Sequence, residues 1–271
     1  MNHKQHTILD APRRIRRGPT VDKDEKLIVA INQLREFDTA LLANTIGYID
    51  PTPPHEYYMG SSIGCLTPGL GPSVGVAVTC ELESSTPNVK ADWDLYWKQL
   101  EEISEIGVPV VWVVKTVGSR PDHECVLGDG MAKTLYAAGC IAVVTDGGVR
   151  DLHAFPSIPF AAYGRGKTIH HCPIRFHRTN QPIEVGGITI RPGDIIHANA
   201  EGVIRIPANC LGQLAERAVA MRAFEQDAHR HLRRTDLTTS EKRQLVESLV
   251  VKYGFAPDHK AIGGKRPSIQ L

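Results

Sequence analysis

Three charged residues around a glycine-rich turn carry the strongest chemical signal in the sequence. Asp129 stands just before a predicted helix, and Arg150-Asp151 follow the buried apolar run 141–145 and a glycine-rich turn. In a largely parallel α/β sheet, ligands collect where strands end and helices begin. Asp129 is therefore expected to lie close to Arg150 and Asp151.

The residue types at this edge predict chemistry on a small anion. The amides of Gly130 and Met131 at a helix start suit a carboxylate, and the planar fork of Arg150 suits a carboxylate or an enolate oxygen. Asp129 and Asp151 offer the hard oxygens that Mg²⁺ or Mn²⁺ prefers. Together they favour metal-assisted catalysis.

A purely structural interpretation fits the same spacing. Asp151 would cap a turn, and Arg150 would form a salt bridge with Asp129. Spacing alone does not separate the two interpretations.

Two other segments invite a functional interpretation and do not sustain it. The segment 164–168 (GRGKT) suggests a phosphate-binding loop, but that pattern needs a glycine where this chain has Ala161, and Pro173 follows too soon for a helix. Three histidines, at 170, 171 and 177, have no i, i+4 pair and are expected on the surface.

The elements that position the three residues follow from apolar periodicity. Strands are expected at 74–81, 110–114, 141–145 and 158–162, and helices at 92–106 and 131–138. Short strands follow at 174–176, 183–185, 188–190, 195–197 and 202–206. Trp93 and Trp97 are expected in the core.

Further helices are expected on both sides of this sheet. Apolar spacing predicts one over 27–34 and a second from the N-cap Asp38 to Gly47. A third is expected over 209–231, and Thr238 with Glu241 forms a capping box for a last helix that ends at Gly254. Residues 50–72 read as a loop, 1–20 as an arm and the segment after Pro257 as a tail.

Composition bounds the class of protein. The chain has 271 residues, 42% of them hydrophobic, with a formal net charge of +1, so neither nucleic acid nor an anionic membrane is an expected partner. No apolar run approaches the roughly 20 residues of a spanning helix, and no secretory signal is visible, so a cytoplasmic location is expected. The six cysteines contain no CxxC pair and are expected to be free, mostly buried thiols.

A longer pattern surrounds the charged residues. Asp129 is followed by twenty residues, 130 to 149, and then by Arg150-Asp151, within the text LGD and VVTDGGVRD. This resembles the RraA-like proteins, which include the class II pyruvate aldolases acting on 4-hydroxy-4-methyl-2-oxoglutarate and 4-carboxy-4-hydroxy-2-oxoadipate. The segments 74–81, 159–166 and 182–207 are also similar to that family. The resemblance covers 37–225.

The resemblance implies a fold, an assembly and a division of the chain. The fold is α/β, a swivelling β/β/α domain over 37–225 with additional helices at both ends. The N-terminal arm and helix occupy 1–36, and the C-terminal helix and tail occupy 226–271. The assembly is a homotrimer or homohexamer with sites between subunits.

The resemblance also implies residue roles. Asp151 would bind Mg²⁺ or Mn²⁺, Arg150 would hold the 2-oxo group of pyruvate, and Asp129 would order metal-bound water. The amides of Gly130 and Met131 would bind the substrate carboxylate. The implied activity is cleavage of a 4-hydroxy-2-oxo acid to pyruvate, with decarboxylation of oxaloacetate as a related reaction. No lysine is placed for a Schiff base, and the general base is unassigned.

Two further points belong to the resemblance. Where the family has Ala-Asp, this chain has Ala198-Asn199, a departure expected to alter a contact around the site. The family's namesake binds RNase E and inhibits RNA processing without known chemistry, so a regulator that binds a protein partner is the alternative function. Retention of Asp129, Arg150 and Asp151 favours the enzyme. A methyltransferase is excluded, because no glycine-rich S-adenosylmethionine loop follows an N-terminal strand.

Overall fold

The computed structural model describes residues 21–256, and its centre is a mixed β-sheet. Within these residues the sheet has eight strands, with β9 paired to β2 beside the path β1-β7-β5-β3-β2-β12-β13. The central strands β2, β3, β5 and β7 are parallel, and the outer pairings are antiparallel. The bounds are β1 Gly64–Cys65, β2 Ser73–Glu83, β3 Val110–Thr116, β5 Cys140–Thr145, β7 Ala161–Gly164, β9 Arg175–Thr179, β12 Ile195–Asn199 and β13 Gly202–Ile206.

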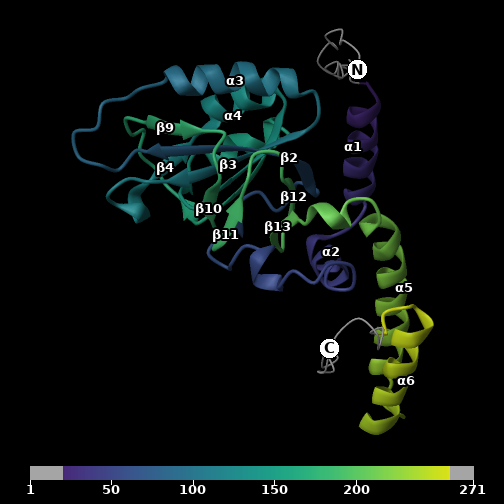
Figure 1. Cartoon of the computed structure of the whole chain (residues 1–271). Coiled ribbons are helices and arrows are strands. Elements are labelled where there is room, and N and C mark those ends of the chain that lie inside the picture. The colour runs from purple at the N-terminus through teal and green to yellow at the C-terminus, as the bar shows by residue number, and fades with distance from the viewer. Residues whose placement is uncertain (1–20, 257–271) are drawn as a thin grey trace, which may run out of the picture.

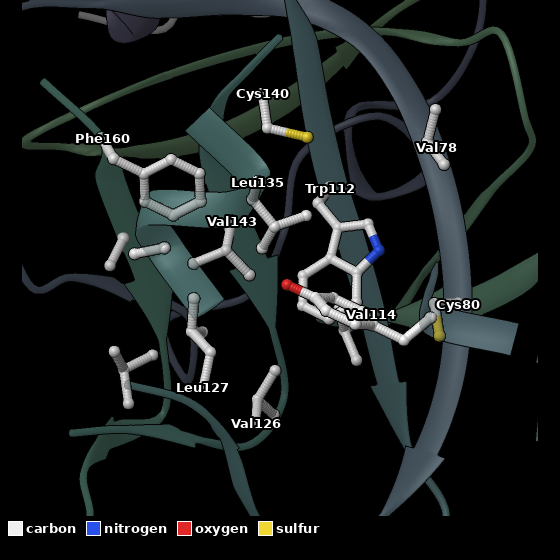
Figure 2. Close-up of a cluster of buried hydrophobic side chains, with 14 of the residues drawn as sticks. Val78, Cys80, Trp112, Val114, Val126, Leu127, Leu135, Cys140, Val143 and Phe160 are labelled. Carbon is white, nitrogen blue, oxygen red and sulfur yellow. The ribbon is translucent and has the colours of Figure 1, made fainter. Parts of the chain in front are cut away.

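Two helices cover one face of the sheet (Figure 1). They are α3 (Asp94–Ile106) and α4 (Asp129–Ala138), and each ends at a glycine in the left-handed region. Such a glycine lets the chain leave a helix without a Cβ penalty. Side chains of α4 and the strands interdigitate there, as Figure 2 shows for Leu135, Trp112 and Val143.

The opposite face is closed by a hairpin, β10 (Ile183–Val185) with β11 (Ile188–Ile190). Its four inward side chains alternate with outward polar ones and join the apolar cluster of the central strands. This alternation is the pattern of a strand with one buried face. The central parallel strands are therefore buried on both faces.

A second, smaller sheet lies at the carboxyl ends of the central strands. It contains β4 (Cys125–Leu127), β6 (Gly148–Val149) and β8 (Gly166–Lys167), all parallel. Strand β4 leads directly into α4, and β6 leads into Arg150. This sheet thus joins the two segments that carry the predicted site residues.

The remaining helices gather at the β12–β13 side of the sheet, where α5 and α6 form a hairpin that extends away from it (Figure 1). They are α1 (Val21–Leu34), α2 (Thr39–Ile46), α5 (Leu214–Leu232) and α6 (Thr239–Lys252). The Asp38 carboxylate caps α2 by accepting from the Leu41 amide, and Thr238 and Glu241 form the predicted capping box. These caps satisfy amides that a helix start leaves unpaired.

Most predicted elements are confirmed within a few residues, and several expectations are wrong. Residues 50–72, expected as a loop, contribute strand β1 to the sheet, and the helix expected over 209–231 begins only at Leu214, after the 3₁₀ turn Ala208–Cys210. The strand expected at 158–162 is β7, which begins only at Ala161, because Pro159 has no amide to donate to a sheet. Trp97 is not in the core: its side chain is 55% exposed. The buried face of α3 is set by Tyr96, Leu100 and Ile103, and Trp97 lies to one side of it.

Three other expectations concern the chain as a whole. All six cysteines are free thiols, and four are buried, as predicted. None of the helices within 21–256 is long and apolar enough to cross a membrane. The predicted arm at 1–20 and the tail after Pro257 lie outside the described residues.

Candidate active site

Arg150 and Asp151 leave the small sheet together at the end of β6. The Arg150 amide donates to the Leu127 carbonyl of β4 at 3.0 Å, which continues the ladder by one residue. The Arg150 guanidinium contacts the carboxylate of its own neighbour, with 2.7 Å from Nη1 to Oδ2 of Asp151. Both side chains are about one quarter exposed, at 25% and 28%. The pair is therefore accessible to a small ligand.

The backbone of Asp151 adopts the left-handed conformation, with φ 59° and ψ 26°. Aspartate tolerates this region better than most residues, at a cost of roughly 1 kcal/mol or more. Asp151 precedes the 3₁₀ helix Leu152–Ser157, yet its side chain makes no capping hydrogen bond to it. The sequence left open a turn-capping role for the Asp151 carboxylate. The structure does not show that role, because the carboxylate faces Arg150.

Gly128 brings the helix start against this pair. A Cβ added at Gly128 would lie 2.6 Å from Oδ2 of Asp151 and 2.9 Å from Cζ of Arg150. Real Cβ atoms do not approach other atoms this closely, so only glycine fits without displacing the pair. Gly128 is the N-cap of α4, and its carbonyl accepts from the Ala132 amide at 3.1 Å. The predicted meeting of the helix start with Arg150 and Asp151 is confirmed.

Asp129 takes a different partner from the predicted one. Its carboxylate accepts from Lys133, one turn along α4, at 2.6 Å, so the salt bridge to Arg150 that the sequence allowed is wrong. The Lys133 hydrogen bond lowers the pKa of Asp129, and the Gly130 amide and the positive charge of Arg150 act in the same direction. Asp129 therefore stays ionised beside Arg150.

Lys133 lies beside Asp129, and its environment bears on the expectation that no lysine is placed for a Schiff base. It lies four residues after Asp129, the spacing that pairs side chains on one helix face. Its side chain is 57% exposed and bound to a carboxylate. Schiff-base lysines are instead activated by desolvation or by a neighbouring cation. Lys133 lacks that environment.

The helix start presents the two predicted amides. The helix begins at Asp129, earlier than the predicted 131, so Gly130 and Met131 occupy its first turn. The first amides of a helix have no partner inside it and attract anions. A Cβ at Gly130 would meet nothing within 4 Å, so the backbone is open on that side.

The segment after β8 borders the pair. The Thr168 amide donates to the Val149 carbonyl at 3.1 Å, immediately before Arg150. Burial raises the pKa of the Cys172 thiol, the negative charge of Glu124 adds to this, and the positive charge of Arg150 opposes it. The Cys172 thiol thus lies within electrostatic range of Glu124 and Arg150.

Within the described part of the chain, no three His, Cys, Asp or Glu side chains are grouped to hold a metal ion. Asp129 and Asp151 are the site's carboxylates, and each already contacts a cation of the protein. Mg²⁺ is commonly bound by one or two carboxylates, with water and substrate oxygens completing its coordination. The donor set fits that mode of binding and does not form a closed cage.

Comparison with known proteins places this geometry in a family. The Aldolase/RraA family, described as RraA-like, matches residues 55–205, more than half of the chain. The chain belongs to this family. The RraA-like match includes β4, α4 and β6, which carry the site residues.

One curated relative of this RraA-like chain comes from Halalkalibacterium halodurans and is named "putative 4-hydroxy-4-methyl-2-oxoglutarate aldolase". It is 37% identical over 102 residues, which are 37% of this chain and 47% of that protein. The chain therefore spans less than half the length of this relative.

Two solved structures share the RraA-like fold. RraAS2 of Streptomyces coelicolor, described as an unusual member of the RNase ES inhibitor RraA protein family, superposes with a TM-score of 0.58 at 22% identity, covering 73% of this chain and 95% of its own. An uncharacterized protein of Pseudomonas syringae superposes with a TM-score of 0.56 at 21% sequence identity. The superposition covers 79% of this chain and 96% of that protein. These likenesses confirm the predicted α/β fold class.

The sequence carries a signal for one neighbour of the RraA-like site and none for another. The i, i+4 spacing from Asp129 is a signal for Lys133, whereas nothing local places Cys172 near Arg150. At Asn199, where the family has Asp, the side chain accepts from the Glu201 amide at 2.9 Å, within the β12–β13 turn. That this departure alters a contact around the site stays a prediction.

Proposed function

We propose that this protein is a divalent-metal-dependent class II pyruvate aldolase that cleaves a 4-hydroxy-2-oxo acid, such as 4-hydroxy-4-methyl-2-oxoglutarate. One observation carries the proposal: Arg150 and the Asp151 carboxylate converge on Gly128, at the amide end of α4. This places a guanidinium, a carboxylate and the first amides of α4 around one small region. The similarity to the Halalkalibacterium halodurans protein supports the substrate class.

Each group of the chain has a role in this proposal. The amides of Gly130 and Met131 hold the substrate carboxylate at the helix start. The Arg150 fork holds the 2-oxo oxygen and stabilises the negative charge that develops on it. Asp129, kept ionised by Lys133, orders a water molecule at the site.

Asp151 is the proposed ligand of Mg²⁺ or Mn²⁺, with Asp129 acting through water. A bound divalent ion supplies Lewis-acid stabilisation of the enolate oxygen. Because Arg150 already contacts Asp151, the same carboxylate would hold the guanidinium beside the proposed metal.

The proposed cleavage balances as a retro-aldol reaction. The C3–C4 bond breaks, its electron pair enters the pyruvate enolate, and the 4-hydroxyl passes its proton to water as C4 becomes a carbonyl carbon. Arg150 stabilises the enolate oxygen until C3 is protonated. Oxaloacetate decarboxylation yields the same enolate, so we propose it as a side activity.

The deciding experiment measures pyruvate release from a panel of 4-hydroxy-2-oxo acids with Mg²⁺ or Mn²⁺. We expect turnover that EDTA abolishes and added metal restores. Full turnover after EDTA treatment, or a borohydride-trapped lysine adduct with pyruvate, would contradict the metal-dependent mechanism. Lys133→Met controls for the lysine at the site: it should not alter the borohydride result.

The second candidate function is a regulator that binds a ribonuclease of the RNase E type. The fold similarity to Streptomyces coelicolor RraAS2 favours it. Binding of such a ribonuclease, without pyruvate release from any acid in the panel, would select it over the aldolase. In either case we propose a trimer or hexamer, and a monomer in light scattering would contradict that assembly.

A further inference from the structure

A buried carboxylate outside the proposed site is held by the turn after β2. Glu124 is 1% exposed, and it accepts three hydrogen bonds. The donors are the Ser84 amide at 2.7 Å, the Ser84 hydroxyl at 2.9 Å and the Ser85 hydroxyl at 2.6 Å. A buried carboxylate is tolerated only when its oxygens are hydrogen-bonded, and this one is.

Neighbouring turns close around this carboxylate. A Cβ at Gly118 would lie 1.6 Å from Oε1 of Glu124, and one at Gly147 would lie 3.5 Å from its Cβ. The turn after β3 thus passes directly over the carboxylate, where any side chain at residue 118 would collide with it. The carboxylate sits in a compact polar socket between the turns after β2 and β3, and the turn after β5 borders the base of its side chain.

The backbone of Glu124 connects this socket to the small sheet. Its carbonyl accepts from the Gly148 amide at 2.9 Å. The backbone amide of the next residue, Cys125, donates to the Ser84 hydroxyl at 2.7 Å. Two residues farther, the Leu127 carbonyl accepts from the Arg150 amide. Glu124 therefore joins the large sheet to both β4 and β6.

The small sheet needs such an anchor because its strands are only two or three residues long. A ladder this short does not fix its own position. Val126 and Leu127 also pack into the cluster that Figure 2 shows, which gives β4 apolar contacts with the large sheet. Apolar packing allows small sliding motions, whereas three directed hydrogen bonds fix position.

We infer that Glu124 is a positioning residue that fixes the small sheet, and through it Gly128 and Arg150, against the large sheet. It touches no reacting atom in the proposed reaction. It determines where the helix start and the guanidinium lie relative to each other. The catalytic part of this inference rests on the proposed function, and the structural part does not.

Hydrogen exchange tests the structural part without any substrate. In Glu124→Ala, exchange at the Gly148, Arg150 and Thr168 amides should rise at least about tenfold, while amides of β3 and β5 keep their protection. Glu81→Ala is the matched control: this buried carboxylate near the end of β2 accepts from Arg178 of β9 and is not hydrogen-bonded to the small sheet. It should leave those three amides unchanged.

Kinetics test the catalytic part. Displacing reacting groups by about 1 Å can cost roughly 10²-fold, so kcat of Glu124→Ala should fall by about that factor. KM should change less, and Glu124→Gln, which keeps the shape and two acceptor bonds, should recover much of kcat. A structural defect spread over the whole fold would not lower kcat more than it changes KM, and Glu124→Gln would not restore kcat.

The outcomes distinguish the two proposals. Unchanged exchange at the three amides in Glu124→Ala overturns the positioning role, whatever the activity. Selectively raised exchange in a protein that releases no pyruvate supports the role and rejects the aldolase. If Glu124→Ala does not fold, Ser85→Ala removes one of the three donors, and the same selective rise in exchange is expected on a smaller scale. Equal protection in Ser85→Ala and wild type would then overturn the inference.

Discussion

Arg150 and Asp151 are consecutive residues whose side chains contact each other, with 2.7 Å between Nη1 and Oδ2. Neighbours in a strand point to opposite faces, so such contact requires the backbone to turn between them. The left-handed conformation of Asp151 supplies that turn. Each side chain thus orients the other, and replacing either one tests a different part of the proposed mechanism.

Arg150→Lys keeps the positive charge and removes the planar fork. If the fork stabilises the enolate, turnover should fall by roughly two orders of magnitude or more, the scale of losing one preorganised oxyanion donor. Metal binding should survive, because Asp151 is intact. Pyruvate release and calorimetric Mn²⁺ titration measure the two effects. Wild-type turnover in this variant would remove Arg150 from the mechanism.

Asp151→Asn removes the anionic ligand and should weaken metal binding first. Turnover at low Mn²⁺ should be lost and partly recovered at high Mn²⁺. The fold should remain, because Asp151 follows a strand end and is partly exposed. Loss of folding in both Asp151→Asn and Arg150→Lys would instead mean that the pair is structural.

Gly128→Ala tests the contact between the helix start and the pair. Gly128 has an extended backbone, φ −123°, ψ −168°, which any residue adopts, so the variant introduces a collision without backbone strain. The new methyl group must displace Arg150 or Asp151, and kcat/KM should fall at least about tenfold. Gly212→Ala, where the methyl group would meet nothing within 4 Å, is the control and should match wild type. Equal kinetics in both variants would show that the close packing at Gly128 is dispensable.

The meeting of the helix start at Gly128 with Arg150 and Asp151 could be predicted from the sequence, because strand ends and helix starts share an edge in any parallel α/β sheet. The pairing within the site could not. The contact between Arg150 and Asp151 depends on the positive φ of Asp151, and no local sequence pattern predicts that positive φ. The start of β7 was predicted three residues too early, since apolar residues on both sides of Pro159 hide the break.

Glu124 illustrates a different limit. Its three donors belong to residues some forty positions earlier, so no periodicity or motif within a helix or strand links them. A lone glutamate before a short apolar run reads as an ordinary surface residue. Long-range polar sockets of this kind become visible only when the strands are in place.

His197 of β12 gives a prediction for stability against pH. Its side chain is fully buried, with Nδ1 3.0 Å from the Thr39 hydroxyl and Nε2 3.2 Å from the Leu34 carbonyl. Because a carbonyl only accepts, we assign the proton to Nε2, and Nδ1 then accepts from Thr39. Burial lowers the pKa of His197 from 6.5 to about 4.

The sign follows from proton uptake. Between pH 6.5 and 4 the unfolded chain binds a proton at His197 and the folded chain does not, so the free energy of unfolding falls as pH falls. The stabilisation from neutral, buried His197 is fully present above pH 6.5. Below that pH, the free energy of unfolding falls by about 1.4 kcal/mol for each pH unit of acidification, or by about 2 kcal/mol between pH 6.5 and 5. Urea unfolding of wild type and His197→Gln at several pH values between 7 and 5 measures it. The variant should be less stable at pH 7, yet lose less stability on acidification, and parallel curves for the two proteins would show that His197 is not the titrating group.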